Sequence, residues 1–191
     1  TAAEQIHARL PKNHGHPLDL LIVGAGPAGI SAALRAKELG LAFEVIEQGT
    51  VAQSIRSFPR GKLVFDQPLE LPVAGKLWLE ESSKEELLAK WLQIVRTERL
   101  PVSEQHRFLG LTPIDGGFEI RVENEDGEEQ RRSARVLLAV GTRGSPRKLP
   151  IDLSEKVESK VFYHLADARS FVGQRILVVG LGDTAMETAI A

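Results

Sequence analysis

The sequence predicts an α/β fold with a parallel sheet, and two observations support this prediction. Apolar segments of strand length recur at Leu18–Val23, Ala42–Ile46, Arg135–Val140 and Arg175–Val179. Segments of helical composition follow the first and the last of these, each after a glycine-rich turn. Strands that alternate with helices in this way are typical of parallel sheets.

The first glycine-rich turn is Gly24–Gly29 (GAGPAG), which lies between a predicted strand and a predicted helix over Ile30–Gly40. In this context the pattern G-x-G-x-x-G indicates a dinucleotide site. Gly24 permits the tight turn, Gly26 lets the backbone approach a pyrophosphate, and Gly29 lets the helix pack closely on the strand. The helix N-terminus then presents free N–H groups to the phosphates. The alternative is a glycine-rich turn of another βαβ unit.

The second predicted strand, Ala42–Ile46, ends at Glu47. An acid at the end of the second strand of such a unit is placed to accept hydrogen bonds from ribose hydroxyls. The first turn and this carboxylate together predict a site for a dinucleotide.

The composition is that of an ordinary globular chain. Of the 191 residues, 42% are hydrophobic and 26% are charged, and the net charge is −2. This balance offers no electrostatic basis for nucleic-acid or anionic membrane partners, and no apolar run approaches the roughly 20 residues that a membrane span needs. The first residues lack the apolar core of a signal peptide, so a cytoplasmic location is the default expectation.

The chain contains no cysteine. A disulfide framework, a thiolate-ligated metal and a redox-active C-x-x-C pair are therefore excluded within these residues. Any redox chemistry must come from a bound cofactor.

Residues 1–17 are predicted to be a linker, because they contain Pro11, Gly15 and Pro17. Three histidines in this segment suggest a metal site as the alternative, but no acid or cysteine lies at ligand spacing.

The stretch Gln48–Gly75 has little periodicity, and both a functional loop and an ordinary surface loop remain open for it. Within it, Lys62–Phe65 is predicted to be a short extended piece.

A helix is predicted from Ser83 to about Arg99. Ser83 and Glu86 have the spacing of a capping box, and apolar residues follow with helical periodicity. Trp91 falls within this apolar stripe, which favours core packing over a role in stacking on a ligand.

Short strands with turn signals are predicted from Pro101 to Arg135. His106–Thr112 and Phe118–Val122 flank a hairpin turn, and a second turn at residues 124–127 leads to a weak polar strand. Basic and acidic residues in this region predict a solvated, charge-compensated edge (Arg131, Arg132 and Arg135 with Glu123, Glu125, Glu128 and Glu129).

The second glycine-rich turn is Gly180–Ala185, with the pattern G-x-G-x-x-A. It follows the predicted strand Arg175–Val179 and opens a predicted helix over Met186–Ala191. Two such units in one chain imply two dinucleotide sites. The alternative for this copy is a turn that binds no ligand.

Four segments in this order resemble two-dinucleotide-binding-domain flavoproteins of the thioredoxin-reductase-like group. The segments are Ile22–Leu34, the acid of VIEQG (Glu47), Leu137–Thr142 and Ile176–Ala191. The resemblance implies a Rossmann-like FAD-binding domain with three-layer ββα character and a small antiparallel β-meander over residues 18–150. Residues 151–191 are then the first βα unit of a second, NAD(P)H-binding Rossmann domain, which is cut short.

The resemblance also implies cofactor-binding residues. The FAD pyrophosphate is assigned to the first turn (Gly24, Gly26, Pro27, Ala28 and Gly29), and the adenosine ribose to Glu47, with Gln48 beside it. Three residues are expected along the FAD (Ala139, Gly141 and Thr142), and Asp66 near the flavin ring. The NAD(P)H pyrophosphate is assigned to the second turn (Gly180, Gly182, Asp183, Thr184 and Ala185). No catalytic acid–base residue is expected, and His164 is assigned to a hinge or the surface.

Two motifs of related flavoproteins are absent from this sequence, and their absence limits the resemblance to some members of the group. The C-x-x-C of thioredoxin reductases is absent from Val157–Gly173, and the F-x-G-x-x-x-H signature of flavin monooxygenases is absent too. Cysteine-free relatives are more similar, namely ferredoxin–NADP reductases of the thioredoxin-reductase type and bacillithiol-disulfide-reductase-like proteins.

The expected function is hydride transfer from NAD(P)H to FAD and onward to an acceptor of ferredoxin or disulfide type. The alternatives are a non-catalytic flavin- or nucleotide-binding module and a flavin monooxygenase. This fragment alone is expected to be inactive. A homodimer is one candidate assembly of the protein, and no nucleic-acid or membrane partner is expected.

Overall fold

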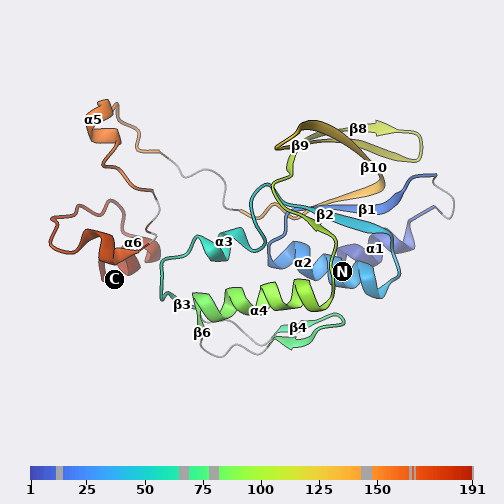
Figure 1. Cartoon of the computed structure of the whole chain (residues 1–191), viewed down its shortest axis with the longest axis horizontal. Helices are drawn as coiled ribbons and strands as arrows, with labels where there is room; N and C mark the ends of the chain where they lie inside the picture. The colour runs from blue at the N-terminus through green and yellow to red at the C-terminus, as the bar shows by residue number, and fades with distance from the viewer. Residues whose placement is uncertain are drawn as a thin grey trace.

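A six-stranded mixed sheet forms the centre of the protein, with strand order β7-β2-β1-β10-β9-β8 (Figure 1). The computed structural model describes residues 1–11, 15–64, 69–77, 82–142, 148–163, 165 and 167–190. The bounds of the six strands, in chain order, are β1 (Leu18–Val23), β2 (Phe43–Ile46), β7 (Val102–Ser103), β8 (Arg107–Ile114), β9 (Gly117–Asn124) and β10 (Gly127–Leu138). β1 pairs in parallel with both β2 and β10, whereas β8, β9 and β10 form an antiparallel meander. The predicted α/β fold and its meander are therefore confirmed.

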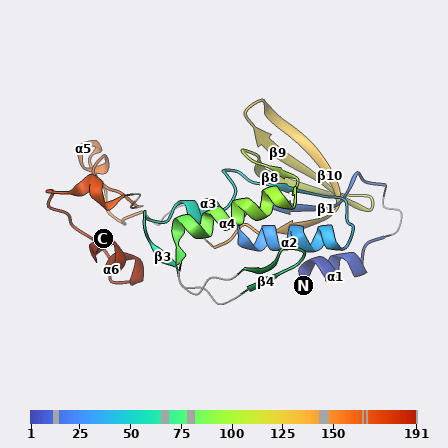
Figure 2. The same ribbon diagram turned by 60° about the horizontal axis from the view of Figure 1, so that its bottom comes forward.

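The two faces of β1 are covered by different layers (Figures 1 and 2). Leu20 and Ile22 point to a core that includes residues of α2 (Pro27–Glu38) and α4 (Lys84–Thr97). Leu21 and Val23 point to the opposite face, where they pack with residues of β9. Burial on both faces explains why the sequence of β1 is almost continuously apolar rather than alternating.

Smaller elements complete the part of the chain before β10. α3 (Gln53–Arg56) follows β2. Two short antiparallel strand pairs follow: β3 (Leu63–Val64) pairs with β6 (Ser82–Ser83), and β4 (Leu69–Leu71) pairs with β5 (Gly75–Leu77). The extended piece predicted at Lys62–Phe65 is confirmed for the two residues of β3.

Helix α4 confirms the predicted capping box. The Ser83 hydroxyl accepts a hydrogen bond from the Glu86 N–H at 3.3 Å, and the Glu86 carboxylate accepts one from the Ser83 N–H at 2.8 Å. Trp91 is 2% exposed and belongs to the core between the helices and the sheet. Its assignment to core packing is therefore confirmed.

Strand β10 differs from the prediction. A weak polar strand and a separate buried strand over Arg135–Val140 were expected, but the structure contains one strand of 12 residues. Its first part pairs with β9 and its last part with β1, so polar and apolar halves of one strand serve two different neighbours. The strand ends at Leu138, and Val140 is 64% exposed.

The N-terminal residues also differ from the prediction of a linker. Residues 2–8 form α1 (Ala2–Ala8), whose N-cap Thr1 and Glu4 make a capping box. α1 lies along α2 (Figures 1 and 2), Ala3 is 2% exposed, and Arg35 of α2 forms an ion pair with Glu4. The T-x-x-E pattern was the sequence signal for this helix.

The strand predicted at Arg175–Val179 is not formed. Leu177 is 85% exposed, and among the described residues no strand lies beside this segment. A parallel strand needs neighbours to pair its backbone groups, and an apolar sequence alone does not supply them. Residues 148–190 otherwise contain α5 (Glu155–Glu158), a short 3-10 helix (Ala168–Phe171) and α6 (Asp183–Ile190).

Candidate functional site

The first glycine turn lies at the carboxyl ends of β1, β2 and β10. β2, the next strand in the chain, lies on one side of β1, and β10 lies on the other side. The strand order therefore reverses at β1, next to the glycine turn. In open α/β sheets such a switch point is the usual place for a ligand. The Gly24 N–H donates to the Ile46 carbonyl at 2.7 Å, and the Ala139 N–H donates to the Val23 carbonyl at 2.8 Å.

Two glycines in this turn are required by close backbone contacts. Gly24 has a φ of +106°, and a Cβ there would lie 2.5 Å from the Ala139 carbonyl oxygen. A Cβ on Gly29 would lie 1.9 Å from the carbonyl oxygen of Gly24. The helix can therefore approach the strand only where position 29 has no side chain.

Gly26 is different, because no atom lies within 4 Å of the position that its Cβ would take. It is the N-cap of α2, with extended backbone and no side-chain cap, and Pro27 follows as the first helical residue. Pro27 and Ala28 are exposed. The start of α2 is therefore open to solvent at the point where an anion would meet its N–H groups.

Glu47 is 9% exposed, and both of its carboxylate oxygens accept backbone hydrogen bonds. One accepts from the Ala25 N–H at 2.8 Å and the other from the Gly49 N–H at 2.9 Å. Each oxygen keeps a further lone pair, so the predicted contact to ribose stays a prediction compatible with this geometry. Gln48 is exposed beside it.

The remaining predicted residues of the first site follow β10 at the same edge. Ala139 contacts the glycine turn, Gly141 has a φ of +68°, and Thr142 is exposed. The structure thus brings the residues before α2, at the end of β2 and after β10 to one edge of the sheet. Asp66 and His164 lie outside the described residues.

The second glycine turn is only partly like the first. Gly180 has a φ of +131°, and the Gly182 carbonyl accepts from the N–H groups of Ala185 and Met186 at 2.9 and 3.1 Å. The predicted helix is present but begins earlier than expected: α6 starts at Asp183, directly after Gly182, rather than at Met186, and Thr184 is exposed. The predicted strand in front of the turn is missing, so this unit has a turn and a helix without the sheet.

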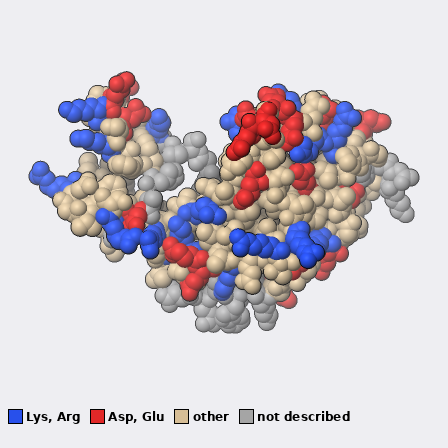
Figure 3. Space-filling model, viewed as in Figure 1, with Lys and Arg blue, Asp and Glu red and all other residues tan. Residues whose placement is uncertain are grey.

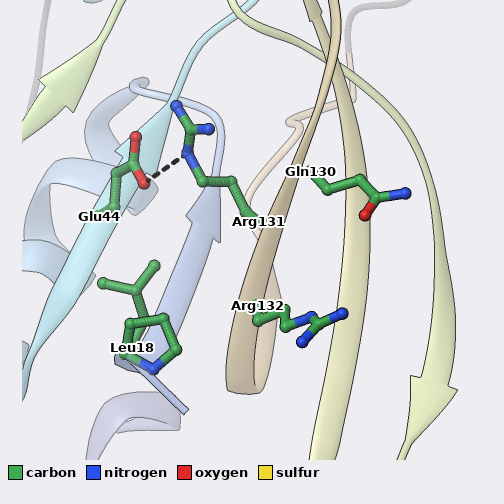
Figure 4. A pocket seen from close by; sticks show the side chains of 6 residues that line it. Leu18, Glu44, Gln130, Arg131 and Arg132 are labelled. Carbon is green, nitrogen blue, oxygen red and sulfur yellow. Dashed lines mark hydrogen bonds and ion pairs between the residues drawn. The ribbon is translucent and has the colours of Figure 1, made fainter.

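A pocket of about 470 Å³ lies between β2 and β10 near the start of β1, away from the glycine turn (Figure 4). Its charged side chains are already paired: Arg131 contacts Glu44 at 3.2 Å and Glu129 at 2.8 Å, and Arg132 contacts Glu119 at 3.0 Å. Side chains whose charges are paired offer little to a polar ligand. We therefore assign these charges to the stability of the sheet.

Charged side chains of both signs also cover the outside of the meander (Figure 3). Ion pairs join Arg107 to Glu123 at 3.1 Å and Arg121 to Glu128 at 3.7 Å. The charge-compensated surface that the sequence predicts is thus present.

The Glu129–Arg131 pair predicts a dependence of stability on pH. The hydrogen bond from Arg131 lowers the pKa of Glu129 below its ordinary value. Stability from a carboxyl with a lowered pKa is complete above the unfolded value of about 4.3 and is lost as the pH falls through the folded value. We expect Glu129→Gln to be less stable than the wild type above about pH 5, with the difference shrinking below about pH 4.

Urea unfolding between pH 3 and 7 measures this difference. Glu125→Gln, in the exposed turn before β10, is the matched control and should follow the wild type throughout. A Glu129→Gln variant whose deficit is the same at pH 3 and pH 7 would contradict the assignment.

The part of the chain that the structure describes shows neither a membrane-spanning helix nor a metal site. Among the described residues, no helix has both the length and the apolar character required to cross a membrane. Within the same part of the chain, no three His, Cys, Asp or Glu side chains come together as metal ligands.

The structure adds two residues that sequence reasoning missed. Glu104 and Gln105, directly after β7, contact the loop that follows Glu47. They lie in a short polar segment without any motif, so only the folded arrangement identifies them.

Comparison with known proteins identifies relatives of this chain. A ferredoxin–NADP reductase from Ignicoccus hospitalis is 31% identical over 173 residues, which are 90% of this chain and 51% of the relative. The chain thus spans about half the length of the curated relatives it matches.

Solved structures show the same fold. A bacillithiol disulfide reductase from Staphylococcus aureus matches with a TM-score of 0.78 and 21% identity, over 91% of this chain and 53% of that one. The structure of OTEMO in complex with FAD and NADP matches with a TM-score of 0.57 and 17% identity, over 71% of this chain and 27% of that one.

The family model for pyridine nucleotide-disulphide oxidoreductases matches residues 21–191. With a match over most of its length, the chain belongs to the pyridine nucleotide-disulphide oxidoreductase family.

Proposed function

We propose that the protein is an FAD-dependent oxidoreductase that takes a hydride from NAD(P)H and passes electrons to an acceptor of ferredoxin or disulfide type. The family and the likeness to ferredoxin–NADP reductases support the reaction class. The observation that carries the proposal is the open start of α2 at Gly26, which lies at the switch point of the sheet.

The residues of the first site fit the FAD pyrophosphate and adenosine. Backbone can approach the phosphates closely at Gly26, since no atom occupies the space beside it. The N-terminus of α2 supplies positive potential there, and Glu47 supplies a carboxylate for the ribose. Gly141 and Thr142 lie at the same edge and extend the surface along which the cofactor would lie. When bound, FAD supplies the hydride and electron chemistry, and this chain's residues bind and orient it.

The second site fits NAD(P)H less completely. The turn at Gly180–Gly182 and the N-terminus of α6 are present, but no strand among the described residues supports them. The assignment of Gly180, Gly182, Asp183, Thr184 and Ala185 to NAD(P)H therefore depends on the sequence pattern. Because the chain has no cysteine, no redox-active disulfide can come from these 191 residues.

Binding of FAD tests the proposal. We expect the wild-type chain to retain flavin absorbance after desalting, and Gly26→Ala to bind FAD at least about tenfold more weakly, because its methyl group fills the space of the pyrophosphate. Gly182→Ala is the matched control, since its Cβ also meets no atom within 4 Å. It should bind FAD as the wild type does, if FAD occupies the first site.

Two results would contradict the assignment: no FAD binding by the wild type, or equal binding by Gly26→Ala. Because the chain spans about half the length of its relatives, anaerobic addition of NADH and NADPH to the FAD-loaded full-length protein is the experiment that distinguishes an enzyme from a non-catalytic module. Bleaching of the flavin identifies an oxidoreductase. Consumption of NADPH that requires oxygen and oxygenates a substrate would instead identify a monooxygenase.

A further inference from the structure

The segment after β7 lies against the loop after β2 and is joined to it through the backbone. The Glu47 N–H donates to the Ser103 carbonyl at 3.0 Å, and the His106 N–H donates to the Glu47 carbonyl at 2.8 Å. These two bonds attach the backbone of Glu47 on both sides to one neighbouring segment. The position of Glu47 thus depends on Ser103 and His106, which are distant in the sequence, as well as on β2.

Two side chains strengthen this attachment. A carboxylate oxygen of Glu104 accepts a hydrogen bond from the Val51 N–H at 2.6 Å. The Gly49 carbonyl accepts two bonds from Gln105, at 3.0 Å from its backbone N–H and 3.2 Å from its side-chain amide. Val51 is 4% exposed, so few waters are available to replace the carboxylate as its partner.

Gln105 has a φ of +58°, in the left-handed region that residues other than glycine rarely adopt. Strain of this kind persists where surrounding contacts hold the residue, and such positions gather at functional sites. Here the contacts are those to Gly49, whose own N–H donates to the Glu47 carboxylate at 2.9 Å.

The loop after β2 is in turn joined to the glycine turn. The Ala52 N–H donates to the Ala25 carbonyl at 2.9 Å, and the Ala25 N–H donates to the Glu47 carboxylate at 2.8 Å. A closed set of hydrogen bonds therefore runs from Glu104 through residues 47–52 to the turn. The Glu47 carboxylate is one member of this set, since it accepts from the N–H groups of Ala25 and Gly49.

We propose that Glu104 and Gln105 are positioning residues for the adenosine end of the bound dinucleotide. They hold residues 47–52 in the conformation that aims the Glu47 carboxylate at the ribose and keeps the loop against the glycine turn. Neither residue needs to touch the ligand. This inference rests on the proposed binding of FAD at the first site.

The test compares Glu104→Ala with Glu104→Gln. Alanine removes the acceptor for the Val51 N–H, whereas glutamine keeps a carbonyl oxygen of the same reach. The control is Glu125→Ala, an exposed glutamate of the β9–β10 turn. Two quantities are measured for each protein: the dissociation constants of FAD and ADP, and the hydrogen exchange rate of the Val51 amide without ligand.

We expect Glu104→Ala to weaken the binding of FAD and of ADP by the same factor of about ten. Both ligands carry the adenosine whose ribose the Glu47 carboxylate is proposed to bind. The Val51 amide should exchange faster by a similar factor. Glu104→Gln should restore most of the affinity and protection, and Glu125→Ala should match the wild type.

The outcomes separate the inference from the proposed function. A wild type that binds FAD and ADP, beside a Glu104→Ala variant that binds them equally well, overturns the positioning role alone. Unchanged exchange at Val51 in Glu104→Ala also overturns it, whatever the ligand data show. A wild type that binds neither ligand overturns the proposed function, together with any role in binding for Glu104.

Discussion

Gly29→Ala is expected to destabilise the chain by at least about 3 kcal/mol, at the upper end of what overpacking costs. The added Cβ would lie 1.9 Å from the Gly24 carbonyl oxygen, a contact between two backbones that no side-chain rotation relieves. Gly24 cannot move away easily, because its N–H is bonded to β2 and its own Cβ position is closed by Ala139. Helix α2 must therefore separate from β1.

Urea unfolding of the two proteins measures this loss. Gly26→Ala, three residues earlier in the same turn, is the matched control, since its Cβ meets no atom within 4 Å. We expect it to cost no more than about 1 kcal/mol, as for a less favourable N-cap. Equal stabilities of Gly29→Ala and Gly26→Ala would show that the strand and helix do not pack as closely as described.

Trp91→Ala is expected to lower the free energy of unfolding by about 3–5 kcal/mol, the usual cost of removing a large buried aromatic side chain. Trp91 is 2% exposed and lies in the core cluster that joins α4 to α2 and the sheet. The cavity left by the indole is bordered by residues of several elements, so no single element can collapse to fill it.

The matched control for Trp91→Ala is Gln93→Ala, two residues further along α4, where the side chain is exposed. It should stay within about 0.5 kcal/mol of the wild type, as surface substitutions usually do. Thermal or urea unfolding distinguishes the two. A loss of less than 1 kcal/mol for Trp91→Ala would place the tryptophan outside the core.

Much of the fold follows from local patterns in the sequence. The apolar run of β1, the glycines after it and the capping box at Ser83 each specify an element through residues close together in the chain. The T-x-x-E pattern at Thr1 and Glu4 is equally local and specifies the start of α1. Nearby residues are thus sufficient to predict an element whose conformation does not depend on pairing with distant strands.

The other features depend on distant residues. Residues 176–179 have the same apolar character as β1, yet only β1 has strands on both sides. β10 is one strand because its polar part meets β9 and its apolar part meets β1. Glu104 and Gln105 belong to no pattern, and their contacts to residues 49 and 51 exist only after β2 and β7 pair.

The pairing of β1 with β10 has a consequence for how the chain folds as it is synthesised. Leu18 pairs with Ser133, so roughly 100 residues must be made after β1 before its second neighbour exists. At typical rates of translation this delay is on the order of ten seconds. During that time β1 has β2 on one side and an open, strongly apolar edge on the other, which is a site for aggregation. A nascent chain of this protein is therefore most in need of a chaperone between the emergence of β2 and that of β10.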